Sequence, residues 1–369
     1  MLKILAGVSR ITLAIQALAC TLTPIALAAA QPSYTITPLG LPTAPSCSAI
    51  GQDTPEAVSI NDAGQVAGID CFVATINGTQ QGIVRGFFWT PQRGAIDIGL
   101  PPGTTDPTTS VWTRGINNRG EIVGYVLNSI GNYAFTWKRP RGITVIASDA
   151  NAVGINASGQ VIGGLLKANH AFLFSHHMVT DLGTIPGAIN SHAFGINYLG
   201  HIAGNADVPA APPVVYNSPA LLWTGGQWRN LGIPAGDVFV GDRGGINIFD
   251  EIAGTSFDAN GHYRAFLWNG DFTILPCLSG QACDAAAIND AGTIVGFANF
   301  GAVVWFAGAI FNLNTLIDPR DPLRGQVQLS FATSINDRGD ITVNGSYTSG
   351  PHNGENEAFV LRPSRDREK

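Results

Sequence analysis

Seven side chains of mixed chemistry stand at one fixed place in a repeated pattern, four residues before the isoleucine of an Ile-Asn-x-x-Gly motif. They are Glu56, Trp112, Asn151, His192, Asp242, Asp284 and Phe331, and Arg114 and Arg243 lie near them in the sequence. Carboxylates, an imidazole, an indole and guanidinium groups brought together could hold a sugar, a peptide or a cation. The alternative is an ordinary solvated rim, which would carry the same residue types without a ligand.

Three of these residues are carboxylic acids, and two of them could form the acid/base pair of a polysaccharide hydrolase or lyase. The candidates are Glu56, Asp242 and Asp284, and such a pair should lie about 5–10 Å apart across a cleft. A binding module should instead expose an aromatic platform, built from Trp112, Tyr216 or Phe331. Because no Gly-x-Ser-x-Gly, His-Glu-x-x-His or phosphate-binding loop occurs, the sequence favours binding, and no catalytic residue is assigned.

The histidines do not indicate a metal site. Five of the seven lie between His170 and His201, but His176 and His177 are expected on the opposite face from His192, and metal ligands must converge. The pairs Asn61-Asp62, Asn289-Asp290 and Asn336-Asp337 lack the Asp-x-Asp-x-Asp spacing of a calcium loop, and turn chemistry explains them. We therefore predict neither a metal nor another cofactor.

Seven copies of one unit supply the elements that position these residues. An Ile and a second Ile or Val six residues later are strand formers, and the Asn-x-x-Gly between them is a turn whose Asn bonds its own backbone and whose Gly supplies a positive φ. Each copy predicts a tight β-hairpin, and Asp250, which replaces the Gly of the fifth copy, tolerates a left-handed φ. The copies are Ser59–Gly68, Gly115–Gly124, Gly154–Gly163, Ala193–Gly204, Gly245–Gly254, Ala287–Gly296 and Ser334–Val343.

A second pair of strands follows each hairpin. The spacing between motif isoleucines ranges from 39 residues (Ile116 to Ile155) to 56 (Ile60 to Ile116). Four short antiparallel strands at such a period predict an all-β fold, a seven-bladed β-propeller. The third strands carry Trp and Phe that should pack between blades, and they are Gly86–Trp89, Ala134–Trp137, His170–Phe174, Ala220–Trp223, Ala265–Trp268, Ala302–Trp305 and Ala358–Leu361.

The seventh unit ends after its third strand, at Ala358–Leu361. The missing fourth strand is expected at the other end of the chain, as Tyr34–Gly40. A strand from the N-terminus that completes the last blade would join the two ends and leave no open sheet edge.

The pattern resembles the HAF-repeat family of extracellular repeat proteins, named for His-Ala-Phe in the third strand. His170–Phe174, Asp181–Thr184 and Gly195–Asn197 match its consensus, and the resemblance covers nearly all of the chain after residue 30. Only the third blade keeps the His; Glu357 and Arg264 are among its replacements elsewhere. The resemblance implies export and a propeller-like fold, and it implies no known activity.

In such a ring the hairpin turns lie on one face, and the longer connections lie on the other, which we call the elaborated face. The long connections include Asp70–Arg85 and Asn205–Ser218, and the candidate residues above are expected at the mouth of the central channel on this face. Cys47, Cys71, Cys277 and Cys283 sit on or beside these loops. Three pairings are possible, and local closure favours Cys47–Cys71 and Cys277–Cys283. Variable loops on a rigid scaffold are the usual place of function.

The first thirty residues read as a signal peptide. Lys3 and Arg10 form its charged region, Ile11–Leu27 its apolar region and Ala28–Ala30 its cleavage site, with a weaker alternative of lipidation at Cys20. Loss of Lys3 and Arg10 would take the net charge from −6 to −8, which argues against nucleic acid as a partner.

We expect an exported monomer, periplasmic or extracellular and without a transmembrane anchor. It would comprise one domain over residues 31–361 and a charged tail over 362–369, and it would bind a glycan or a protein.

Overall fold

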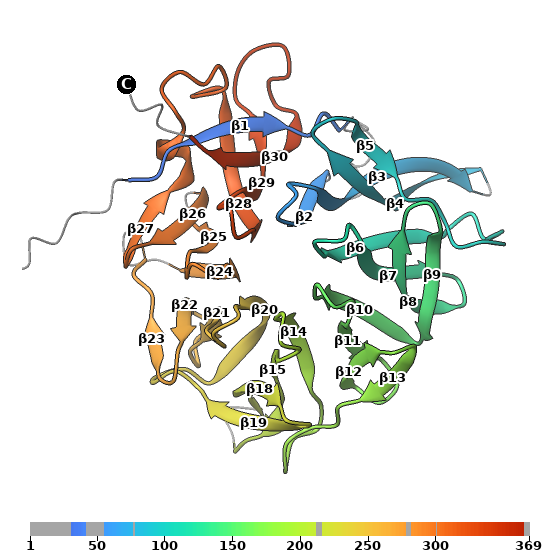
Figure 1. The fold of residues 1–369 in the computed structure, drawn as a ribbon, viewed down its shortest axis with the longest axis vertical. Coiled ribbons are helices and arrows are strands. Elements are labelled where there is room, and N and C mark those ends of the chain that lie inside the picture. The colour runs from blue at the N-terminus through green and yellow to red at the C-terminus, as the bar shows by residue number, and fades with distance from the viewer. Residues whose placement is uncertain are drawn as a thin grey trace, which may run out of the picture. The chain divides into compact units, whose positions relative to one another are not determined.

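In a computed structural model the chain forms seven four-stranded antiparallel sheets, arranged as blades around a central axis (Figure 1). The structure describes residues 31–41, 55–76, 78–211, 216–277, 282–299 and 301–364. The predicted signal peptide and Cys47 lie outside these residues. The fold is the seven-bladed β-propeller that the repeat predicts.

The motif sets the boundaries of the two inner strands of every blade. Each innermost strand ends at the motif isoleucine: β2 (Glu56–Ile60), β6 (Ser110–Ile116), β10 (Ala150–Ile155), β14 (His192–Ile196), β20 (Phe239–Ile246), β24 (Cys283–Ile288) and β28 (Val327–Ile335). Each second strand begins at the Ile or Val six residues later: β3 (Val66–Ile76), β7 (Ile122–Asn128), β11 (Val161–Leu165), β15 (Ile202–Asn205), β21 (Ile252–Phe257), β25 (Ile294–Ala298) and β29 (Ile341–Tyr347).

The two outer strands complete each blade. The third strands are β4 (Thr79–Thr90), β8 (Gly131–Lys138), β12 (His170–Ser175), β18 (Ala220–Thr224), β22 (Tyr263–Trp268), β26 (Gly301–Phe306) and β30 (Asn356–Pro363). The outermost strands are β5 (Gly94–Asp97), β9 (Gly142–Ser148), β13 (Met178–Asp181), β19 (Gln227–Gly232), β23 (Phe272–Ile274), β27 (Ala309–Asn312) and, in the last blade, β1 (Tyr34–Pro38).

The N-terminal strand closes the ring, as predicted. β1 pairs antiparallel with β30, from Tyr34 opposite Pro363 to Pro38 opposite Phe359. β30 therefore runs two residues past Leu361, the predicted end of the domain, because β1 offers backbone partners that far. The first and last parts of the described chain share one blade, so this sheet has no unpaired outer edge at β30.

One predicted loop is a strand pair instead. Asp70–Arg85 was expected to be a long connection, but β3 and β4 continue through it and pair as far as Ile76 opposite Thr79. The segment carries Val73, Ile76 and Ile83, which are β-branched and extend an already formed ladder. The connection in the fourth blade contains a small sheet of β16 (Val208–Pro209) and β17 (Tyr216–Asn217), and the sixth blade is followed by the short 3-10 helix η3 (Leu313–Leu316).

Packing between blades confirms the role predicted for the third-strand aromatics. Phe135, Phe172, Phe266 and Phe359 are fully buried. Glycine is required at the last position of the motif for a different reason, which is seen at Gly124. A β-bulge in the inner strand brings the Trp112 carbonyl oxygen over this glycine, so that an added Cβ would overlap it. The motif thus needs glycine here for close approach of the backbone.

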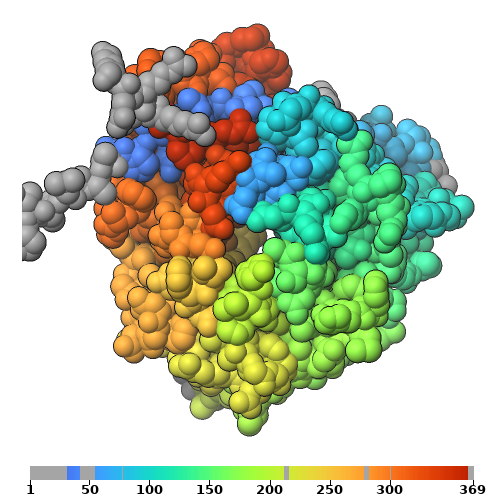
Figure 2. Space-filling view, in the orientation of Figure 1, coloured from blue at the N-terminus to red at the C-terminus, as the bar shows by residue number. Residues whose placement is uncertain are grey.

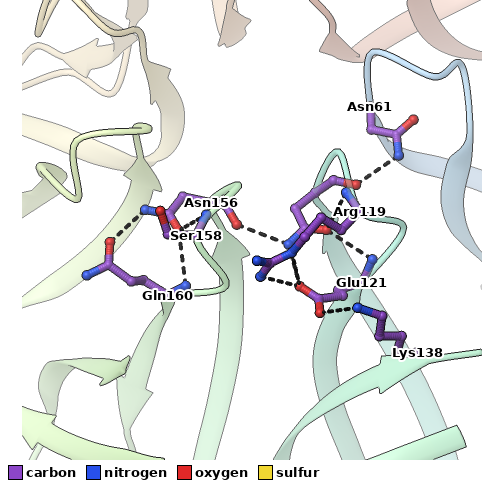
Figure 3. Close-up of polar contacts among 8 residues, drawn as sticks. Asn61, Arg119, Glu121, Lys138, Asn156, Ser158 and Gln160 are labelled. Carbon is purple, nitrogen blue, oxygen red and sulfur yellow. Dashed lines mark hydrogen bonds and ion pairs between the residues drawn. The ribbon is translucent and has the colours of Figure 1, made fainter. Parts of the chain in front are cut away.

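The motif asparagines form a closed ring of hydrogen bonds. The Oδ1 of each accepts bonds within its own turn, as Asn156 does from the amides of Ser158 (3.1 Å) and Gln160 (3.0 Å). Its Nδ2 donates to the carbonyl of the equivalent asparagine in the next blade (Figure 3). The seven donors are Asn61, Asn117, Asn156, Asn197, Asn247, Asn289 and Asn336, at 2.8–3.4 Å, and the last bonds back to Asn61.

Candidate functional site

All nine predicted site residues lie on the innermost strands, one strand from each blade contributing. Contacts group several of them into two clusters, one between the fifth and sixth blades and one on the second blade. Of the remaining members, Asn151 accepts a bond from Asn132 of the neighbouring blade (3.2 Å). Glu56, His192 and Phe331 are paired in register with Ile69, Asn205 and Asn344.

An enlarged β-bulge distinguishes the fifth blade. Elsewhere each register shift of an innermost strand leaves out a single residue, as between Ala57 and Ser59, and the seventh blade has two such shifts. In β20 the register passes from Val240 opposite Ser256 to Gly244 opposite Gly254, so residues 241–243 face Thr255 alone. Because a bulge bends its strand and redirects side chains, Asp242 and Arg243 are exposed.

Asp284 lies beside this bulge, at the start of β24 in the sixth blade. Its side chain is buried, with 8% of the residue exposed, and its Oδ1 has no hydrogen-bond partner in the described part of the chain. Burial raises the pKa of this carboxyl, the Arg243 charge and a bond from the Thr255 hydroxyl oppose the rise, and the Asp242 charge adds to it. Asp284, Asp242 and Arg243 therefore form one electrostatically coupled cluster, which we call the bulge cluster.

Four aromatic rings lie next to the bulge cluster. Phe239 and Phe257 stack with centroids 4.3 Å apart and an interplanar angle of 11°. Tyr263 continues the row at 5.8 Å from Phe257, and Phe297 lies 6.4 Å from Tyr263. Phe297 is the register partner of Asp284, which ties the row to the carboxyl. All four rings are partly exposed.

Neighbouring elements hold this site in place. The Nδ2 of Asn205 donates to the Val240 carbonyl (2.7 Å), and the Val240 amide donates to the Ser218 carbonyl (2.7 Å). Asp237, whose side chain is fully buried, accepts bonds from Arg264 and Ser256, each 2.5 Å long. The predicted disulfide Cys277–Cys283 is confirmed, with Cα atoms 6.0 Å apart, and it ends one residue before Asp284.

The second blade carries the other cluster. Trp112 stacks on its register partner Tyr125 at 6.1 Å, and the Arg114 guanidinium lies 5.6 Å and 5.5 Å from the two ring centroids. Arg114 also donates to the Tyr125 hydroxyl (3.2 Å), while the buried indole Nε1 of Trp112 has no partner among the described residues. The guanidinium occupies one aromatic face as a cation–π partner, so this cluster offers less free ring surface than the row beside the bulge.

The aromatic row was not predicted from the sequence. Phe239, Phe257, Tyr263 and Phe297 come from four strands of two blades, and no motif joins them. The run Gly241–Gly245, with charged residues between glycines, was a signal for the bulge. Tyr216, predicted as part of a platform, is exposed on β17.

The ring has a central cavity of about 460 Å³ at the end where the hairpin turns lie. It is lined by motif residues of all seven blades and by none of the nine predicted residues. Figure 2 shows the hollow centre of the ring. The cavity lies on the face opposite the long connections, where the sequence analysis placed only turns.

Cys71 is disulfide-bonded, and Cys47, its predicted partner, lies outside the described residues. In the described part of the chain no three His, Cys, Asp or Glu side chains converge as metal ligands would. The helices described there include none that is long and apolar enough to span a membrane.

Comparison with solved structures places this geometry among propellers. The β-propeller domain of the trilobed protease from Pyrococcus furiosus matches with a TM-score of 0.55 at 10% identity, over 82% of this chain and 91% of that one. TolB from Acinetobacter baumannii matches at 0.38 and 12% identity over 81% and 80%, and the acylaminoacyl peptidase of Pyrococcus horikoshii at 0.49 and 10% over 85% and 53%.

The chain is a β-propeller. Identities of 10–12% show the fold alone. The chain spans about half the length of the peptidase it matches. No protein-family model and no curated protein matches the sequence.

Proposed function

We propose that this propeller is an exported binding module that holds a glycan on its elaborated face, between the fifth and sixth blades. The observation that carries the proposal is the Asp284 carboxyl, which is buried with one oxygen unpartnered. Natural proteins rarely leave such a group unsatisfied without a functional reason. The exposed Asp242 and Arg243 stand beside it.

The composition of the surroundings favours a glycan among polar ligands. Sugar rings present flat C–H faces edged by hydroxyl groups, so they suit an aromatic surface bordered by hydrogen-bonding groups. The row of Phe239, Phe257 and Tyr263 supplies the first, and Asp242 and Arg243 supply the second. A few fixed polar groups next to apolar walls are the usual design of small-ligand sites.

Export is part of the proposal and rests on the cysteines and the sequence pattern. Disulfides persist in oxidising compartments, and Cys71, Cys277 and Cys283 are all disulfide-bonded. The resemblance to HAF-repeat proteins and the signal-peptide pattern of the first thirty residues point the same way.

A glycan array probed with purified Gln31–Lys369 tests the proposal. Asp242→Asn and Tyr263→Ala should each weaken binding about tenfold, the loss typical of an important contact. Asp271→Asn is the matched control, because Asp271 is exposed on the same blade in the turn between β22 and β23, away from the bulge cluster. No binding by the wild type, or equal binding by all variants, would overturn the proposal.

A second candidate function is cleavage of a polysaccharide, by hydrolysis or by elimination as in a lyase, with Asp242 and Asp284 as the acid and base. One observation favours it: the two carboxyls are electrostatically coupled, and one is buried with a raised pKa while the other is exposed. Such a difference in environment assigns acid and base roles in glycosidases. Glycans that bind should then be shortened, as mass spectrometry would detect, and Asp284→Asn should abolish the products. Glycans that bind and stay intact would exclude the hydrolase or lyase function and retain the binding function.

A further inference from the structure

The hairpin turns of the fourth and fifth blades carry large apolar side chains that the fold does not need. Tyr198 and Leu199 are 64% and 60% exposed, and Phe249 is 68% exposed next to Ile248 at 38%. The same two turn positions hold Ala157 and Ser158 in the third blade, and Asn118 and Arg119 in the second. Since turns of this type favour polar or small residues, four apolar side chains on adjacent turns form a patch that needs another explanation.

An unusual contact holds this patch together. Asp250 occupies the turn position that is glycine in the other copies, with φ at 62°, which costs about 1 kcal/mol or more for a residue other than glycine. Its carboxylate accepts a bond from Asn197 Nδ2 (2.9 Å) and contacts His201 Nδ1 (2.8 Å) of the neighbouring blade. The strained residue thereby ties the turn of the fifth blade to that of the fourth.

Acidic residues continue around the central cavity from the patch, beginning with Asp290, whose Oδ1 accepts the amide of Ile248 (3.0 Å). Asp290, Asp337 and Asp62 follow the motif asparagines of the sixth, seventh and first blades, and all three line the cavity. Burial raises the pKa of Asp337, and the charges of Asp290 and Asp62 contribute to the rise. Two cations of the hairpin turns are paired within their own turns, Arg338 with Asp340 and Arg119 with Glu121.

We propose that this face docks a protein segment in which a Lys or Arg stands beside a large apolar residue. The apolar side chain would cover Tyr198 and Phe249, and the cation would enter the 460 Å³ cavity towards Asp290 and Asp337. Charge complementarity selects this occupant. A second copy placed face to face would bring acidic rims together, and an anionic membrane surface would be repelled by them. The proposal is independent of the glycan site, which lies on the other face.

An array of short peptides tests this docking proposal. Each peptide has Gly-Ser flanks around one pair of residues, and the array covers all combinations of that pair. Purified Gln31–Lys369 should bind best to pairs of Lys or Arg with Phe, Tyr, Leu or Ile, and acidic pairs should bind least. Array signal at or below the Gly-Ser background for every pair, or a preference for acidic pairs, would overturn the proposal.

Matched variants test whether the peptide binds at the apolar patch and the acidic cavity. Tyr198→Ala with Phe249→Ser restores residues that the third blade uses at these positions, so the turns should still form. Asp290→Asn with Asp337→Asn keeps the oxygen that accepts an amide of the preceding blade, as Asn118 Oδ1 already accepts the amide of Asp62 at 2.9 Å. Each pair of changes should weaken peptide binding at least tenfold, and only the second should remove its salt dependence. Met178→Ser, at an exposed residue of β13, is the control.

Two further measurements distinguish the proposed peptide from a glycan or a membrane surface. Asp242→Asn should leave peptide binding unchanged, so failure of the glycan proposal would not affect this one. Sedimentation with phosphatidylcholine vesicles should show no binding. Vesicle binding that depends on Tyr198 and Phe249, or peptide binding that survives both pairs of changes, would overturn the docking of a basic–apolar segment.

Discussion

At the scale of single residues, the motif asparagine has two structural roles. Its side-chain oxygen fixes the turn of its own blade, and its amide group donates to the next blade. The asparagines are 2–5% exposed, so a lost bond leaves a buried polar group unsatisfied, which costs more than a surface bond. One residue type therefore secures both the hairpin and its register with its neighbour.

Asn156→Ala should lower the free energy of unfolding by about 2–3 kcal/mol. The change removes two bonds within the turn and the donor to the Asn197 carbonyl. Urea denaturation measures it, with Asn269→Ala, at an exposed turn position, as the control. Equal midpoints for wild type and Asn156→Ala would show that the ring of bonds does not stabilise the fold.

The last glycine of the motif gives a second prediction. Gly124→Ala should cost about 2 kcal/mol or more, because the new methyl group would overlap the Trp112 carbonyl oxygen. Gly164→Ala is the control, since Gly164 follows a motif glycine, has ordinary φ and has no atom within 4 Å of an added Cβ. Thermal melting compares the two, and similar melting temperatures would contradict the steric explanation.

At the scale of elements, β1 is the strand that closes the ring. Tyr34 and Ile36 are buried against the seventh blade, and burial raises the pKa of Tyr34 to about 12. Hydrogen bonds reach beyond the blade: the Ile36 amide donates to the Asp321 carboxylate (2.8 Å), and the Asp318 amide donates to the Tyr34 carbonyl (2.8 Å). The strand thus joins its own sheet to the connection that follows the sixth blade.

Deleting Gln31–Gly40 should destabilise the propeller by at least about 4 kcal/mol, the value of burying two or three large apolar side chains. Tyr34 and Leu39, each 4% exposed, are lost with the segment. Differential scanning calorimetry would show a lower melting temperature than for a variant that lacks only residues 1–30. An unchanged melting temperature would refute closure by β1.

At the scale of the whole molecule, the junction of first and last blades contains two buried acids. Burial raises the pKa of Glu357 to about 7 and that of Asp70 to about 6, and the charge of Asp70 adds to the rise at Glu357. Amides of Ala358, Leu41 and Gly40 bond to Glu357 and limit the effect. The point where the ring closes is therefore also a point that responds to pH.

Stability should fall as the pH rises from 5 to 8. The folded state holds these protons more tightly than the unfolded state, so the stabilisation present at low pH is lost as pH passes through the raised pKa values. Glu357→Gln should remove most of this dependence, and Glu355→Gln, at an exposed neighbour, should retain it. Urea midpoints across the range measure it. Midpoints that rise with pH in the wild type would contradict the assignment; carboxyls with lowered pKa, such as Asp258 at about 2, act only below about pH 4.

The repeat pattern was enough to predict the number of blades, the ends of their inner strands and closure by Tyr34–Gly40, of which the structure forms β1 as Tyr34–Pro38. These follow from local chemistry: strand formers on either side of an Asn-x-x-Gly turn, repeated seven times. The sequence also favoured Cys277–Cys283, whose short loop is a local property. The prediction of a loop at Asp70–Arg85 was wrong, because two paired strands can extend further than the turn residues in their sequence indicate.

Only the tertiary structure decided which side chains meet. The asparagine ring joins residues 39 to 275 positions apart, and the bulge cluster joins Asp242 to Asp284 across two blades. The placement of Tyr198, Asp290 and Asp337 around one cavity appears only when the blades close. A local pattern specifies each hairpin because its partners are neighbours in the chain. Sites form where blades pack against each other, and no motif encodes that contact.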